Sequence, residues 1–159
     1  MSEKLTVEQE ATNYQTMRHI ERVRNLLSLC VSDLLKRAEA HDQSKLEHPE
    51  VGMFTEFTPK LAKSTYGSSE YEGFRKAMGP ALAHHYANNR HHPEHHKNGI
   101  DDMNLIDVLE MLMDWKAASE RHNDGNILTS IEKNADRFKM SQQLVRLLEN
   151  TARSLDLAR

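Results

Sequence analysis

Residues 105–115 read Leu-Ile-Asp-Val-Leu-Glu-Met-Leu-Met-Asp-Trp, and this stretch gives the clearest secondary-structure signal in the chain. Its apolar residues recur at steps of three and four, which is the period of an α-helix. Asn104 directly precedes the stretch and is placed to cap the N-terminus of that helix. The same period continues through most of the sequence, so we predict an all-α protein.

The rest of the chain divides into about six predicted helices. A length of 159 residues suits one compact helical domain spanning residues 1–159. One predicted helix runs through Phe74 and Tyr86 and is kinked at Pro80. The last two are predicted over residues 127–138 and, after a Ser141 cap, from Gln142 to about Leu157.

The first predicted helix opens at Thr6, whose hydroxyl could cap it, with Gln9 three places further on. An apolar stripe follows, which we expect to face inward. Its residues are Ile20, Val23, Leu26, Leu27 and Cys30.

Composition excludes several classes of protein. The net charge is −3 and the basic residues are scattered, so duplex nucleic acid is not an expected partner. No apolar run has the length of a membrane span, and the first residues lack the core of a secretory signal. Cys30 is the only cysteine. These features favour a cytoplasmic protein, and they leave a homodimer open.

Histidine is the unusual component: six of the ten histidines fall between His84 and His96. Histidine is the commonest metal ligand and titrates close to neutral pH, so the cluster indicates a metal or acid–base site. His84, Asn88 and His91 would share one face of a helix, and His85 and His92 another. Either face could hold a metal ion or a phosphate.

Two further groups of polar residues fit a metal site. His41 and Asp42 are adjacent and together offer the nitrogen and oxygen donors that a divalent ion accepts. Asp107, Glu110 and Asp114 form an acidic stripe on the helix quoted above. Seven residues of helix rise about 10 Å, so Asp107 and Asp114 cannot bind the same ion directly. We predict that Asp107 is the ligand and that Asp114 serves the substrate or a second ion.

In order along the chain, His19, His41-Asp42 and Asp107 with Glu110-Met111 resemble the HD-domain phosphohydrolase superfamily. The chain is also similar, over nearly its whole length, to a small uncharacterised bacterial and phage family. That pattern reads here as His41-Asp-x-Ser-Lys45, Tyr66-Gly-Ser, His84-His-Tyr, Asn89-Arg-His-His92 and Glu110-Met-x-x-Asp-Trp115. The superfamily resemblance implies metal ligands at His19, His41, Asp42 and Asp107.

Two positions depart from the superfamily pattern. Lys45 stands where the related nucleotidases carry a glutamate, so their acid–base scheme cannot be transferred. His19 and His41 would lie about 33 Å apart along one straight helix. They can share an ion only if the chain reverses between about Cys30 and Asp33. If the helix continues, His84 or His85 takes the place of His19.

These observations lead to a predicted metal-dependent phosphohydrolase that acts on a nucleotide or another small phosphate ester. One or two divalent ions (Mn, Fe, Co, Ni or Zn) would activate a water molecule. Lys45 would stabilise the negative charge of the transition state, and His85 or His92 would protonate the leaving oxygen. Predicted metal ligands are His19, His41, Asp42, His84 and Asp107; predicted substrate-binding residues are Lys63, Tyr66, Asn88, Asp114, Asn134 and Arg137.

Two alternatives stay open at this point. One is an HD-like oxygenase with two irons, which bound iron and oxygen uptake would distinguish. The other is a non-catalytic interaction protein in which the metal is a structural clip, so that removing the metal unfolds the chain. The sequence does not decide the substrate, the metal, the oligomeric state or the role of Glu110.

Overall fold

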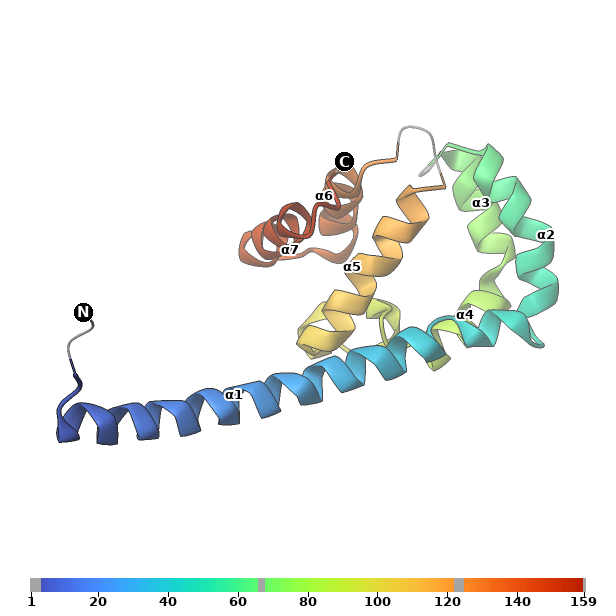
Figure 1. Ribbon diagram of the computed structural model, residues 1–159. Coiled ribbons are helices and arrows are strands. Elements are labelled where there is room, and N and C mark those ends of the chain that lie inside the picture. Colours follow the sequence, from blue (N-terminus) through green and yellow to red (C-terminus); the bar gives the residue numbers. More distant parts are fainter. Residues whose placement is uncertain (1–3, 66–67, 122–124, 159) are drawn as a thin grey trace. The chain divides into compact units, whose positions relative to one another are not determined.

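A computed structural model describes residues 4–65, 68–121 and 125–158 of the chain (Figure 1). Over these three ranges the structure contains seven α-helices and three short 3-10 helices, and no strand. The predicted all-α class is therefore confirmed. The elements are α1 (Val7–Ala40), η1 (Gln43–Leu46), α2 (Glu50–Lys63), α3 (Ser69–Ala77), α4 (Gly79–Asn88), η2 (Pro93–His95), η3 (Gly99–Asp102), α5 (Leu105–Ser119), α6 (Ile127–Phe138) and α7 (Gln142–Ser154).

Two units follow one another along the chain, the first ending at Glu39 and the second starting at Ala40. The first consists essentially of α1. The Thr6 hydroxyl accepts a hydrogen bond from the Gln9 amide at 3.2 Å, and the Gln9 side chain accepts one from the Thr6 amide at 2.8 Å. This reciprocal cap is the predicted start of the helix.

Helix α1 is continuous for 34 residues (Figure 1). The reversal that would bring His19 to His41 does not occur, because residues 30–33 are ordinary helix. The stretch contains neither glycine nor proline, the residues that most readily break a helix. The condition for His19 to be a ligand is therefore not met, and the stripe expected to face inward contains no buried residue among those described.

The chain turns sharply where α1 ends. Asp42 has a φ of 57°, in the left-handed region that aspartate tolerates better than most residues, and it leads directly into η1. The amide of Lys45 then bonds to the carbonyl of Asp42 at 2.9 Å. The turn holds His41, Asp42 and Lys45 within one short segment.

The predicted kinked helix is in fact two helices, α3 and α4. Helix α3 ends at Ala77, and Gly79 and Pro80 form the first turn of α4. Proline is favoured in that first turn because its missing amide hydrogen would have no partner there. Pro80 therefore starts a helix instead of bending one.

One hydrophobic core cluster lies between α5, α6 and α7, which pack in sequence order, and Phe57, Met78 and Ala81 are also buried, in the segment from α2 to α4. The predicted caps Asn104 and Ser141 both accept backbone hydrogen bonds at the starts of α5 and α7. Leu105, the first residue of α5, is 76% exposed and takes no part in this core. The buried residues of this cluster are Val108, Met111, Leu112, Ile127, Ile131, Leu148 and Ala152.

None of the helices in the described ranges combines the length and the apolar composition needed to cross a membrane.

Candidate metal centre

Three segments of the second unit bring ligand-type side chains together. They are the turn after α1, the segment from α4 to η2, and the middle of α5. The side chains fall into three overlapping groups, in each of which one ligand atom per residue lies within 4.8 Å of the others. The groups are Asp42, His85, His91 and His92; His41, Asp42 and Asp114; and His41, His91 and Glu110.

The first group surrounds Oδ1 of Asp42. This oxygen lies 3.3 Å from Nε2 of His85 and 3.6 Å from Nε2 of His91. His85 Nε2 is 2.9 Å from His92 Nε2. Two nitrogens bound to one ion at about 2.1 Å and 90° would be about 3 Å apart, so this spacing fits neighbouring ligands.

Two atoms of this group are buried without a hydrogen-bond partner among the described residues: Oδ1 of Asp42 and Nε2 of His91. A buried polar atom without a partner costs about 1–3 kcal/mol, and such atoms are uncommon in folded proteins. A cation between the two atoms would satisfy both of them. The donor set therefore fits a metal ion.

The second group surrounds the other oxygen of the same carboxylate. Nε2 of His41 lies 3.5 Å from Oδ2 of Asp42 and 3.7 Å from Oδ1 of Asp114. Asp42 thus presents one oxygen to each group. Asp42 would be able to bridge two ions in this position only if the Lys45 ammonium released Oδ2.

Glu110 orients two of the histidines. Its Oε1 accepts a hydrogen bond from Nδ1 of His41 at 2.9 Å and lies 3.1 Å from Nδ1 of His91. With Nδ1 of both rings directed at Glu110, the Nε2 atoms of both rings face Asp42, where a metal ion would take the place of any Nε2 proton. A carboxylate behind a histidine commonly fixes the tautomer of a metal ligand in this way.

Replacing Glu110 with glutamine is expected to weaken metal binding by about 10- to 100-fold, the usual effect of losing such a supporting carboxylate. The amide cannot accept from both rings as the carboxylate does, because one of its two ends is a donor. Metal titration of the purified protein measures the change. Glu120→Gln, at the exposed C-terminal end of the same helix, is the control. Unchanged affinity in Glu110→Gln would contradict the assigned role.

Glu50 also contacts the histidines of the centre, and the sequence analysis did not identify it. It is fully buried in the first turn of α2. Its carboxylate accepts from Nδ1 of His85 at 2.9 Å and from Nδ1 of His84 at 2.6 Å, and Ser44 donates to it at 3.1 Å. Burial raises the pKa of Glu50, but His84, Ser44 and His85 outweigh it and keep the pKa below its usual value.

Neighbouring charges and burial shift the pKa values of two histidines in the centre. Asp114 and Glu110 together raise the pKa of His41 to about 10, against the effect of burial. Burial, with the neighbouring His91 and His85, lowers the pKa of His92 to about 3. His41 is therefore held as a cation among acids, while His92 keeps a free lone pair. A divalent ion would replace the His41 proton as the positive charge that these acids require.

The sequence-based assignment of Asp107 needs correction. Its carboxylate is fully buried, but it bonds to Nε and Nη2 of Arg90 at 3.2 and 3.1 Å. It also accepts from the Asn104 amide at 3.0 Å, which completes a capping box at the start of α5. Asp107 belongs to none of the three ligand groups. Asp114, predicted to serve the substrate or a second ion, lies in the group with His41 and Asp42.

Asp107→Ala is expected to lower the free energy of unfolding by about 2 kcal/mol, because it removes a capping interaction and a partner of Arg90. Metal content should stay at the wild-type level. Denaturant unfolding and elemental analysis measure the two quantities, with the exposed Asp136→Ala on α6 as control. Loss of metal at unchanged stability would restore Asp107 as a ligand.

The remaining predicted residues have other surroundings. His84 contacts Glu50 and lies outside the ligand groups. Asn88 bonds to the His84 carbonyl, and the buried Asn134 to the Ser130 carbonyl. Arg137 pairs with Glu94 at 2.6 Å. Lys63 is exposed in the last turn of α2, and Tyr66 lies outside the described residues.

Lys45 lies beside the centre. Its ammonium contacts Oδ2 of Asp42 at 2.5 Å and sits 5.0 Å above the Phe54 ring. Burial raises the pKa of Asp42, but His85 and Lys45 outweigh it and hold that pKa well below its usual range. Lys45 therefore keeps Asp42 ionised. The other two predicted catalytic residues, His85 and His92, belong to the first ligand group.

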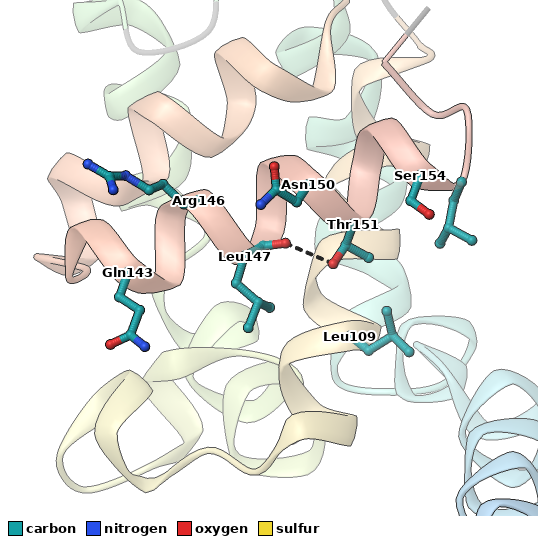
Figure 2. A pocket seen from close by; sticks show the side chains of 8 residues that line it. Leu109, Gln143, Arg146, Leu147, Asn150, Thr151 and Ser154 are labelled. Atoms are coloured by element: carbon teal, nitrogen blue, oxygen red, sulfur yellow. Dashed lines mark hydrogen bonds between the residues drawn. The ribbon is translucent and has the colours of Figure 1, made fainter.

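A separate groove of about 610 Å³ lies between α5 and α7 (Figure 2). Leu109 faces the row of side chains along α7 there, including Leu147 and Thr151. No member of the three ligand groups lines this groove. It is a feature apart from the candidate metal centre.

A protein-family model matches residues 8–154 of the chain. It is described as a family of unknown function, DUF5662, and it carries no HD-domain assignment. No curated protein and no solved structure matches the chain.

Proposed function

The chain belongs to the DUF5662 family, whose function is unknown, and we propose that it is a metal-dependent hydrolase of a small phosphate ester. The observation that carries the proposal is the position of Asp42 between two ligand groups, with one of its oxygens buried and unpartnered among the described residues. Bound ions would number one or two.

The donor types narrow the choice of metal. Imidazole nitrogens and carboxylate oxygens in one site suit divalent transition metals such as Mn, Fe, Co, Ni or Zn. Calcium and magnesium prefer sites made only of oxygen. No cysteine takes part, so the softer ions that thiolates select are disfavoured.

Exposure indicates the side from which a substrate would approach. The side chains of His85 and His91 are 2% and 1% exposed, so they form the floor of the centre. Those of His41, Asp114 and Lys45 are 28%, 24% and 29% exposed. A substrate would therefore reach the centre beside the Lys45 ammonium. The positive charge of Lys45 would favour a substrate with an anionic group.

The chemistry follows from these positions. A divalent ion held by Asp42 and the histidines of the first group would supply a water molecule with a pKa lowered towards neutrality. In hydrolysis the water oxygen forms a bond to phosphorus, the ester P–O bond breaks, and the leaving oxygen takes a proton. Lys45 would stabilise the negative charge on a non-bridging oxygen. Nδ1 of His85 contacts Glu50 and its Nε2 contacts His92, so we assign His85 as a ligand in place of its predicted role as proton donor.

The test begins with elemental analysis of protein purified without added chelator. The loaded protein is then incubated with a panel of nucleoside monophosphates and simple phosphate mono- and diesters, and released phosphate or alcohol is measured. Turnover that depends on the bound metal supports the proposal. Bound iron with oxygen uptake and no hydrolysis would identify an oxygenase. Unfolding on metal removal, with no turnover on any ester, would identify a structural metal.

A further inference from the structure

Two members of the histidine cluster, His95 and His96, lie outside the three ligand groups. The His96 side chain is nevertheless only 7% exposed, and the rings of His95 and His96 contact each other with centroids 4.9 Å apart. Both imidazoles bond to backbone carbonyls of the segment that carries the ligand histidines. Their surroundings therefore indicate a role in the shape of that segment.

His95 caps the end of α4. The last four carbonyls of a helix have no partner within the helix, and Tyr86 is among the last four residues of α4. Nδ1 of His95 lies 2.9 Å from the carbonyl oxygen of Tyr86. Because a carbonyl can only accept, Nδ1 carries the hydrogen and donates it. The bond joins the end of α4 to η2.

His96 makes the equivalent bond with its other ring nitrogen. Nε2 of His96 lies 2.9 Å from the carbonyl oxygen of Arg90, and so it donates to that oxygen. The carboxylate of Asp107 is further away, with its Oδ2 at 4.0 Å from the same nitrogen. The hydrogen-bond acceptor is therefore the Arg90 carbonyl and not Asp107.

These two bonds enclose the ligand-group residues His91 and His92. Residues 89–92 lie between α4 and η2 and form no helix. Their backbone hydrogen bonds are local, since the amides of His92, His95 and His96 each bond to the carbonyl three positions earlier. The imidazole bonds instead span nine and six positions along the chain. They close the stretch into one loop.

We infer that His95 and His96 are positioning residues, which hold this loop in the shape that a metal ion requires. The inference rests on the metal centre of the proposed function and does not depend on the reaction catalysed there. The loop places Nε2 of His91 3.6 Å from Oδ1 of Asp42. Ligands held in place before an ion arrives lose less conformational entropy on binding, so the affinity is higher.

The two rings donate from different nitrogens, which allows a specific test. The amide nitrogen of asparagine is as many bonds from Cβ as Nδ1 of histidine is, and that of glutamine as many as Nε2. His95→Asn and His96→Gln therefore keep a donor in place, whereas the exchanged pair, His95→Gln and His96→Asn, does not. Glutamine carries no charge, so recovery by His96→Gln would also exclude an ion pair with Asp107 as the cause.

Titration of the full chain with Co²⁺, followed by the absorption of the bound ion, measures the affinity and the ligand geometry together. His95→Ala and His96→Ala should each lower the affinity by about 10-fold, the lower end of the range for a residue that supports a ligand. The spectrum at saturating Co²⁺ should match that of the wild type, because neither ring binds the ion. His95→Asn and His96→Gln should recover most of the affinity, and the exchanged amides should not.

The matched control is Ser64→Ala. The buried Ser64 hydroxyl donates to the Leu61 carbonyl at the end of α2, in a bond that encloses no member of a ligand group. Its loss should leave the Co²⁺ affinity unchanged. Denaturant unfolding of each variant checks that it is folded.

Three results would overturn the inference. They are wild-type affinity in both alanine variants, equal recovery by asparagine and glutamine at each position, and an altered spectrum at saturation, which would make the residue a ligand instead. A wild-type chain that binds no Co²⁺ would remove the metal centre, and the proposed function with it. Co²⁺ binding without hydrolysis of any ester would overturn the proposed function alone, and the variants would still decide the roles of His95 and His96.

Discussion

Asp42→Asn is expected to abolish metal binding, lowering the affinity by more than about 100-fold, since the loss of a supporting residue alone costs 10- to 100-fold. The change removes the one carboxylate shared by two ligand groups. Asparagine keeps the size of the side chain and tolerates the left-handed backbone at this position, where φ is 57°. The fold should therefore survive, and the effect should be confined to the charge. Elemental analysis of the purified variant measures it.

The control is Asp101→Asn, an exposed carboxylate on η3 that belongs to no ligand group. Its metal content should match that of the wild type. Asp42→Ala would also remove the remaining oxygen ligand, but alanine in a left-handed turn adds about 1–2 kcal/mol of strain. Full metal content in Asp42→Asn and in Asp42→Ala would exclude Asp42 as a ligand, and the bridging arrangement with it.

Much of the fold was predictable because its determinants are local. The three- and four-residue period gave the helices, and the caps at Thr6, Asn104 and Ser141 gave three of their starts. Prediction failed where two local signals compete. Pro80 can bend a helix or begin one, and the sequence alone does not choose. The continuity of α1 through Cys30 agrees with its composition, since the reversal was only a condition for the ligand role that the resemblance implies for His19.

The candidate site was only partly predictable, because its members meet through tertiary packing. His41, Asp42, His85 and His92 carry signals in the sequence: an adjacent His-Asp pair and a dense histidine cluster. Glu50 gives no such signal, since a glutamate after a proline at a helix start reads as a surface acid. Its role depends on burial against His85.

The sequence supports two interpretations of Asp107, as a site residue or as part of a helix cap, and each has a physical basis. In a helix otherwise rich in apolar residues, an acid indicates a site. At the third position after an Asn cap, however, the same acid completes a capping box. The second reading was visible in the spacing of Asn104 and Asp107, and the structure follows it. Glu110 lies about one turn further along α5, and its Oε1 contacts Nδ1 of His41 and of His91. The sequence alone did not decide whether Glu110 belongs to the site.

Lys45→Ala is expected to lower turnover on an active phosphate ester by roughly 100-fold or more, the effect of removing one preorganised donor to a transition state. The lysine is half-buried beside Asp42, and a phosphoryl group brings negative charge to that side of the centre. The reduction should appear mainly in kcat, because the charge on the non-bridging oxygens is stabilised most in the transition state. Metal content should stay near that of the wild type. Lys45→Arg keeps the charge and should recover part of the activity.

The chain offers a closely matched control in Lys60. Lys45 pairs with Asp42 and lies 5.0 Å above Phe54, and Lys60 pairs with Glu56 at 2.6 Å and lies 4.5 Å above Phe57. The two lysines therefore lose similar contacts when changed to alanine. Only Lys45 adjoins a candidate ligand. If both alanine variants keep wild-type kcat, Lys45 serves only to keep Asp42 ionised, and the transition-state charge must be stabilised by another group.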